Sequence, residues 1–267
     1  MLVDTHCHLN LAQFTDDLDE VIERSLENGI RKIIVPGVDI PTCEKAIEIS
    51  HHYDQVYSAI GIHPNYASAF SSVDLPQLES LAQVSKVVAI GEIGLDKYRD
   101  YSPLENQIFL LEAQLEISRI SRLPVIIHSR SAVPELLSML TKWHDALGKM
   151  KSPLTKRPGV MHAFEGSLEE ALSLSGLNFV FGLGGAATYI PPRVDQRIFA
   201  GLSIDSFVFE TDSPYLPPTS NRGNRNEPAF MVETIKTVSG KMNITYEEIC
   251  EITTITANSI FSLGVIF

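Results

Sequence analysis

The chain has 267 residues, of which 44% are hydrophobic and 20% charged, and its formal net charge is −12. A chain of this length and composition can bury a full core as a single domain over residues 1–267, without disulfides or structural metals to stabilise it. The negative charge argues against a protein that holds nucleic acid on a broad basic surface, but not against an enzyme whose bound cations offset that charge locally.

The cysteines and the apolar segments indicate where the protein works. Cys7, Cys43 and Cys250 are few, odd in number and widely spaced, which predicts reduced thiols rather than a disulfide framework. The first residues lack the basic and long apolar regions of a signal peptide. No apolar run approaches the ~20 residues of a membrane span. We therefore expect a cytoplasmic protein without a membrane segment, and, because no helical stripe requires a partner, a monomer.

Short apolar runs alternate with segments of helical period along the whole chain. The predicted strands are Leu2–Leu9, Lys32–Gly37, Val56–His63, Val87–Leu95, Pro124–His128, Gly159–Phe164, Phe179–Gly184 and Phe207–Asp212. Connections long enough for a crossover helix separate them, so the pattern favours an α/β fold, a single (β/α)8 TIM barrel. A doubly wound open sheet is the alternative.

The segments between the strands predict helices with one apolar face. The clearest are Asp16–Asn28, Pro103–Arg122, Ser131–Trp143, Ser167–Ser175 and Thr245–Leu263. The apolar stripe expected on the second of these consists of Ile108, Leu111, Leu115 and Ile120. Thr245, with Glu248 three residues later, forms a capping-box pattern that predicts the start of the last helix.

Ionisable side chains interrupt these strands at or near their carboxyl ends. His6 and His8 lie two positions apart on the first strand, so both point to the same face. The others are Glu92, His128, His162 and Asp212. In a barrel the carboxyl ends of the strands form the rim at which active sites lie. Burying six such groups is costly unless they bind a cation, so the pattern favours a metal centre over a hydrogen-bonded network without metal.

The number of ligands predicts two divalent cations that share one carboxylate. Six ligands exceed what one ion needs, and paired ions ~3.5–4 Å apart are common in hydrolases. Glu92 is the predicted bridge between the two sites. The remaining ligands of the first site are His6, His8 and Asp212, and those of the second are His128 and His162. Nitrogen and oxygen ligands together suit Zn²⁺, Mn²⁺, Fe²⁺ or Ni²⁺ better than Mg²⁺.

This ligand set predicts hydrolysis by a metal-activated water. A bound divalent cation lowers the pKa of its water towards ~7, so hydroxide is available at neutral pH. Asp212 is placed to accept a proton from that water, so we regard Asp212 and Glu92 as the candidate catalytic residues. Cys7 lies between the two histidines and points the other way, which predicts a core position.

Seven short motifs carry a family resemblance. They are DTHCHL, GIHP, GEIGLD, PVIIHSR, GVMHAFEGS, ETDSPYL and NRNEP, in this order. Together they resemble the TatD family of metal-dependent hydrolases, amidohydrolase-like barrels that include several deoxyribonucleases. The resemblance implies a binuclear site with the same six ligands. It also implies cleavage of phosphodiester bonds in DNA, as a single strand or at its ends.

Several further residues are expected to contact the substrate. The resemblance implies that His63, at the end of the third strand, contacts a phosphate. Arg130 follows the fifth strand and is predicted to pair bidentately with phosphate. Ser213 is predicted to donate a hydrogen bond to the substrate. Arg222 and Arg225 are expected on the same face, where they would attract a phosphate backbone.

The sequence departs from the usual family pattern at the rim. Ser131 stands where the family usually has an acid, and Ala163 and Glu165 stand in the motif that usually reads HCFSG. None of the three is a predicted metal ligand, so they bear on substrate preference more than on catalysis.

Two other functions are compatible with these residues. One is an amidohydrolase-like enzyme that acts on an ester or amide, such as a lactone or aminoacyl ester, and the other is a non-catalytic metal-binding module. Many amidohydrolase barrels bridge their metals with a carboxylated lysine on the fourth strand. Here that strand offers Glu92, and the nearest lysine is Lys97 in the following loop, which favours the TatD interpretation.

Overall fold

The computed structural model describes residues 1–71 and 73–264, in which eight parallel strands pair in sequence order. The strands are β1 (Leu2–Asp4), β2 (Ile30–Pro36), β3 (Val56–Ile60), β4 (Val87–Asp96), β5 (Val125–Arg130), β6 (Gly159–Met161), β7 (Val180–Leu183) and β8 (Phe207–Phe209). Backbone hydrogen bonds from Thr5 to Phe209 and from Asp212 to His6 join the first and last strands. The predicted (β/α)8 barrel is confirmed.

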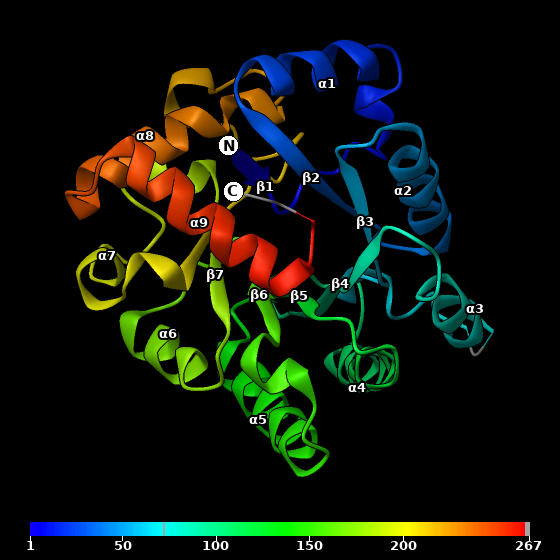
Figure 1. The fold of residues 1–267 in the computed structure, drawn as a ribbon. Helices are drawn as coiled ribbons and strands as arrows, with labels where there is room; N and C mark the ends of the chain where they lie inside the picture. The colour runs from blue at the N-terminus through cyan, green and yellow to red at the C-terminus, as the bar shows by residue number, and fades with distance from the viewer. Residues whose placement is uncertain (72, 265–267) are drawn as a thin grey trace.

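Helices surround the barrel and fill the connections between its strands (Figure 1). They are α1 (Leu18–Glu27), α2 (Ile40–His52), α3 (Asp74–Leu81), α4 (Leu104–Ser121), α5 (Val133–Lys149), α6 (Leu168–Ser175), α7 (Ile198–Gly201), α8 (Met231–Met242) and α9 (Tyr246–Phe261). Thr245 and Glu248 form the predicted capping box at the start of α9. Each predicted helix is present, with ends that differ by up to six residues.

The first strand is shorter than predicted. It ends at Asp4, and His6 and His8 lie in the extended segment that follows it. That segment pairs with the residues after β8 through a bridge between Cys7 and Ser213 and a hydrogen bond from the amide of His8 to the carbonyl of Ser213. The two histidines are therefore held where the barrel closes, just beyond the regular ladder.

The predicted apolar stripe on α4 is wrong at its last position. Leu111 and Leu115 are buried, but Ile120 is 58% exposed. Ile120 lies five residues after Leu115, which places it on another side of a helix with 3.6 residues per turn. Polar residues occupy the buried face instead, because Gln107 and Gln114 bind the backbone of the loops after β4 and β3.

Helix α9 closes the end of the barrel at which the strands begin. It crosses that end in front of the strands and contacts β1 and β8 (Figure 1). A separate apolar cluster lies beneath it, to which the strands contribute residues such as Val3, Ile34 and Val208, and α9 contributes Ile260 and Phe261. A larger cluster fills the space between the strands and the surrounding helices. We call the end that α9 covers the closed end of the barrel.

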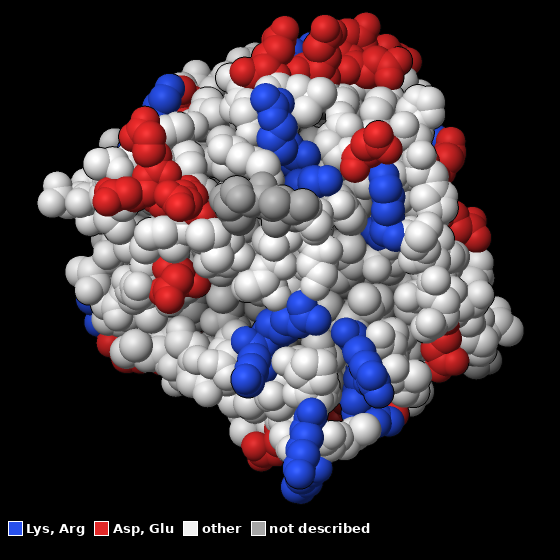
Figure 2. Space-filling view, in the orientation of Figure 1, with Lys and Arg blue, Asp and Glu red and all other residues white. Residues whose placement is uncertain are grey.

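The closed end has a mixed surface. Figure 2 shows acidic side chains gathered over α1 and basic side chains around the lower centre of this face. The net charge of −12 is therefore unevenly distributed, and this face is not uniformly acidic. Among the described residues, no helix is long and apolar enough to cross a membrane.

Candidate metal centre

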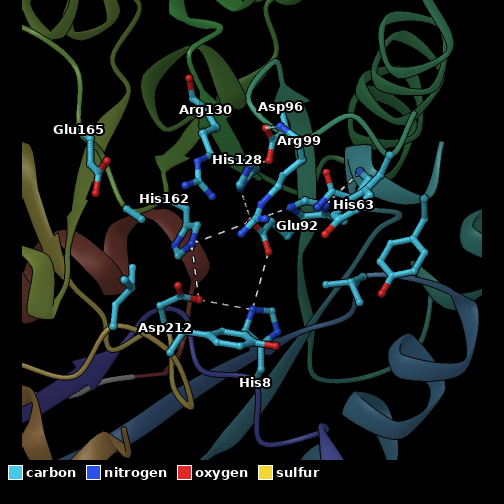
Figure 3. Close-up of a pocket in the computed structure, with 18 of the residues that line it drawn as sticks. His8, His63, Glu92, Asp96, Arg99, His128, Arg130, His162, Glu165 and Asp212 are labelled. Atoms are coloured by element: carbon cyan, nitrogen blue, oxygen red, sulfur yellow. Dashed lines mark hydrogen bonds and ion pairs between the residues drawn. The ribbon is translucent and has the colours of Figure 1, made fainter. Parts of the chain in front are cut away.

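A pocket of about 580 Å³ lies at the opposite end of the barrel, where the strands end. Figure 3 shows six side chains converging on its floor. Glu92 and His128 belong to β4 and β5, and the others lie just after the ends of four further strands: His8, His63, His162 and Asp212. His6 is fully buried directly beneath them. The structure thus brings together all six predicted metal ligands, and we call this the open end of the barrel.

His6 and His8 point their rings at a common point. Their Nε2 atoms are 3.1 Å apart. Oδ1 of Asp212 is 3.8 Å from the Nε2 of His6 and 3.5 Å from that of His8. Oε2 of Glu92 is 3.4 Å from the first nitrogen and 3.7 Å from the second. His6, His8 and Asp212 form a cluster whose ligand atoms lie within 4.8 Å of one another, and Glu92 approaches both of its histidines; together they correspond to the first predicted site.

The spacing of this group fits a metal ion. Zinc bonds of ~2.0–2.1 Å in a tetrahedral site place neighbouring ligand atoms about 3.4 Å apart. The distances that join the two histidine nitrogens to each other and to the two carboxylate oxygens run from 3.1 to 3.8 Å. Two neutral nitrogens and two carboxylates are also a suitable donor set for Zn²⁺ or Mn²⁺.

The second oxygen of Glu92 faces another group of donors. Its Oε1 lies 2.8 Å from Nδ1 of His128 and 3.6 Å from Nε2 of His63. His63, Glu92 and His128 therefore form a second cluster that can hold a metal ion. Glu92 presents one oxygen to each group, as a bridging carboxylate must.

His162 occupies an intermediate position. Its Nε2 is 3.9 Å from Oε1 of Glu92 and 3.7 Å from Oδ1 of Asp212. Its ring stacks on that of His6 with the ring centres 3.5 Å apart. His162 thus touches both groups, whereas His63, which sequence reasoning assigned to the substrate, lies within the second cluster. The assignment of ligands to two separate ions stays a prediction.

The electrostatics keep both carboxylates charged. Burial raises the pKa of Glu92, but neighbouring His63 and His6 outweigh burial and hold it well below its usual range. Burial also raises the pKa of Asp212, and His162 reverses this shift to a net lowering. Both side chains are therefore anionic at neutral pH, the form that binds a cation.

The histidines differ in their protonation state at neutral pH. Burial lowers the pKa of His63 to about 3, and repulsion from His128 adds to that shift. Burial also lowers the pKa of His162, but the carboxylates of Glu210 and Asp212 outweigh it and raise that pKa to about 10. In the metal-free protein at neutral pH, His63 is ready to bind metal while His162 must first lose a proton.

Sequence reasoning missed two carboxylates that support this centre. Oδ2 of Asp96 lies 3.3 Å from Nε2 of His128. Oε1 of Glu210 lies 3.0 Å from Nδ1 of His162 and accepts a hydrogen bond of 2.6 Å from the amide of Ala163. Each of these carboxylates contacts a predicted histidine ligand. Carboxylates behind ligating histidines commonly fix the orientation of the ring. Their positions in GEIGLD and ETDSP were the available signal.

A glycine makes room for Glu210. A Cβ atom on Gly182 of β7 would lie 2.2 Å from Oε2 of Glu210, closer than real contacts allow. Glu210 is 1% exposed. The barrel wall is thus shaped around this carboxylate, which indicates that its position is specific.

The sequence model of the family described as TatD related DNase matches residues 3–262. This chain belongs to the TatD family. Its members are metal-dependent hydrolases, and the closed barrel and clustered ligands agree with that membership.

Individual TatD relatives are similar over nearly their whole length. The chain is 36% identical to the uncharacterized metal-dependent hydrolase YabD of Bacillus subtilis. The aligned region of 265 residues covers 99% of this chain and 100% of YabD. It is 31% identical to the 3'-5' ssDNA/RNA exonuclease TatD of Erwinia billingiae over 90% of each chain. The crystal structure of YjjV, a TatD homologue from Escherichia coli, superposes with a TM-score of 0.89 at 31% identity over 98% of each chain.

Only some of the residues expected to contact substrate lie in the pocket. His63 and Arg130 line the pocket. Ser213 is fully buried beside Cys7 and does not line it, so the expected hydrogen bond from Ser213 to substrate does not fit its position. Arg225 pairs bidentately with Asp17, so it is not free to bind a phosphate backbone.

The departures from the TatD pattern lie at the rim, as expected. Ala163 and Glu165 line the pocket, and Glu165 lies 3.7 Å from Arg193 in an exposed ion pair. Ser131 follows β5 with a φ of +55°. Lys97 pairs with Glu135, outside the pocket lining, so it does not replace Glu92 as a bridge. Cys7, Cys43 and Cys250 are buried and free.

Proposed function

We propose that this protein is a phosphodiesterase that hydrolyses DNA, as single strands or at strand ends, with two divalent cations. The proposal rests on the position of Glu92 on the floor of the pocket, where each of its two carboxylate oxygens faces a different group of donors. The name of the Erwinia relative, a 3'-5' ssDNA/RNA exonuclease, supports this substrate class. Three free cysteines support a reducing cytoplasmic location.

The shape of the pocket supports a single strand over a duplex. Its volume of about 580 Å³ lies in the range of pockets that enclose a small molecule, so one or two nucleotides fill it. A double helix is too wide to reach ligands on the floor of such a pocket, whereas a strand end can enter it. His63 and Arg130 line the wall and would orient the phosphate.

We propose the same ligands for the two cations as the sequence predicts. His6, His8 and Asp212 with one oxygen of Glu92 would hold the first. The other oxygen of Glu92, with His128 and His162, would hold the second. His63 forms a cluster with Glu92 and His128 and lies beside this proposed site. When bound, such cations supply hydroxide at neutral pH and stabilise negative charge on the phosphoryl group.

Asp212 is the proposed proton acceptor of the reaction. Its carboxylate lines the pocket, and its lowered pKa leaves it anionic. The water oxygen forms a bond to phosphorus, the bond from phosphorus to the ester oxygen breaks, and the proton passes through Asp212 towards the leaving oxygen. The products are a phosphomonoester and a free hydroxyl.

The test is phosphodiesterase activity on a short single-stranded DNA oligomer. Metal-stripped protein is assayed with added Mn²⁺, Mg²⁺ or Zn²⁺, beside Glu92→Gln, which preserves side-chain shape but removes the shared charge. We expect metal-dependent cleavage in the natural protein and its loss in the variant. If every metal left the DNA intact while the protein bound two ions, the proposal would be wrong, and ester and amide substrates would be tested next.

A further inference from the structure

Arginine and tyrosine side chains form one wall of the pocket, outside the metal ligands. Arg99, Tyr101 and Arg130 line the pocket, and Tyr98 lies beside them. The guanidinium of Arg130 is 4.1 Å from the ring centre of Tyr98, and that of Arg99 is 5.6 Å from Tyr98 and 6.0 Å from Tyr101. We call these four residues the arginine–tyrosine cluster.

The cluster presents unneutralised positive charge to the pocket. Within residues 1–71 and 73–264, neither Arg99 nor Arg130 forms an ion pair, whereas Arg24, Arg197 and Arg225 each pair with carboxylates. Figure 3 shows Arg99 and Arg130 extending from the rim over Glu92 and His128. On a protein with a net charge of −12, two such cations at a pocket mouth favour an anionic ligand.

The cluster also presents aromatic surface. Tyr98 is 64% exposed and Tyr101 is 62% exposed. A site for inorganic phosphate or a carboxylate needs cations but no aromatic rings. Interleaved arginines and exposed rings are the combination with which proteins bind single-stranded nucleic acid, because each base has a flat face that stacks on an aromatic ring.

The loop after β4, which carries three of the four residues, is anchored to the candidate metal centre. Oδ1 of Asp96 accepts hydrogen bonds from the amides of Tyr98 and Arg99, at 2.9 and 2.8 Å. Gln107 of α4 binds both the amide and the carbonyl of Asp96. The other oxygen of Asp96 contacts His128. The backbone at Tyr98 and Arg99 is therefore fixed beside the ligands, which limits the entropy that this loop loses on binding.

We propose that the arginine–tyrosine cluster is the subsite for the nucleotide next to the scissile phosphate of single-stranded DNA. Arg99 and Arg130 bind the flanking phosphate, and Tyr98 or Tyr101 stacks on the base. This inference rests on the proposed function and specifies it: the enzyme recognises a base as well as a phosphate, without selecting a sequence.

The experiment compares two strands with the same phosphates. One is a short oligothymidylate, and the other carries abasic tetrahydrofuran residues; both have phosphorothioate linkages that resist hydrolysis. Affinity for the metal-loaded protein is measured by fluorescence anisotropy. The double variant Tyr98→Leu/Tyr101→Leu removes both rings, and Tyr98→Phe/Tyr101→Phe is the matched control that retains them. Both tyrosines lie on the exposed surface, and circular dichroism checks that each variant is folded.

We expect the leucine variant to bind the thymidylate strand about tenfold more weakly and the abasic strand equally well. The phenylalanine variant should match the natural protein. Arg99→Gln should weaken the binding of both strands by the same factor and reduce the salt dependence of that binding. Equal binding of the thymidylate strand by the leucine variant and the natural protein would overturn the inference, and so would an equal loss for both strands.

The same data separate this inference from the proposed function. Natural protein that cleaves unmodified DNA while the leucine variant binds normally would leave the hydrolase intact and remove the stacking subsite. Natural protein that cleaves no DNA but loses base-dependent binding in the leucine variant would retain the subsite and remove the phosphodiesterase proposal.

Discussion

At its closed end, the barrel is covered by α9 over an apolar cluster that includes Val3, Val208 and Phe261. At its open end, carboxylates and histidines surround a pocket, and each histidine of the centre lies within 4 Å of a carboxylate. Burial of apolar surface stabilises a fold, whereas burial of ionisable groups costs free energy that ion pairs, hydrogen bonds or a bound cation must offset. The closed end therefore contributes mainly to stability and the open end mainly to activity.

The largest effect is expected at Asp212. Asp212→Asn removes the proton acceptor and one metal-binding charge, so the rate of DNA hydrolysis should fall about 10³-fold or more. Asparagine tolerates the φ of +55° at this position, so the backbone need not change. The free energy of unfolding, measured in urea with a chelator present, should not fall. A loss of stability comparable to the loss of activity would contradict the division between the two ends.

The next effect is expected at the closed end. Phe261→Ala leaves a cavity under α9 and should lower the free energy of unfolding by about 3–5 kcal/mol in urea titrations. Activity per folded molecule, assayed well below the unfolding midpoint, should be unchanged. Leu172→Ala is the control, because Leu172 is 50% exposed and its loss should change stability by less than about 0.5 kcal/mol. A fall in specific activity for Phe261→Ala would show that the ends are coupled.

A smaller effect is expected behind the ligands. Glu210→Gln keeps the shape of the side chain but removes the charge behind His162, so metal affinity should weaken about 10- to 100-fold. Gly182→Ala should reproduce that loss, because its Cβ would displace the same carboxylate. Isothermal titration calorimetry with Zn²⁺ or Mn²⁺ measures both. Unchanged affinity in both variants would mean that Glu210 does not position His162.

The smallest effect is a pH dependence of metal binding. The pKa of His162 is about 10 without metal, so it is protonated at neutral pH, and a metal ion must displace that proton. Affinity should therefore rise with pH below that value, by about tenfold per unit for one proton. His63, whose pKa is about 3, releases none. Calorimetry in two buffers of different ionisation enthalpy counts the protons, and a count of zero near pH 7 would contradict the prediction.

Much of the barrel and of the ligand set is predictable from sequence because both depend on local patterns. Apolar runs fix the strands, and a polar residue at the end of such a run marks the rim, as Asp212 and His128 illustrate. The helix phase is less secure: Ile120 continues an apolar pattern in the sequence, yet faces solvent five residues after Leu115.

The parts that the sequence did not predict depend on which side chains meet across the fold. Glu210 precedes Asp212 by two residues, but only the register of β7 and β8 places it behind His162 and over Gly182. Ser213 seemed available because it follows Asp212, whereas the bridge to Cys7 buries it. Such pairings join residues far apart in the chain, and no local period encodes them.

The side chain of Asp96 connects two parts of the site. One of its oxygens accepts hydrogen bonds from the amides of Tyr98 and Arg99, and the other contacts His128. Occupancy of the ligand cluster and occupancy of the rim loop therefore act on a common group. Thermodynamic reciprocity follows: whatever factor the cations add to the affinity for a strand, the strand adds to the affinity for the cations. A strand that binds more tightly to the metal-loaded protein would, by the same factor, disfavour the loss of the metals.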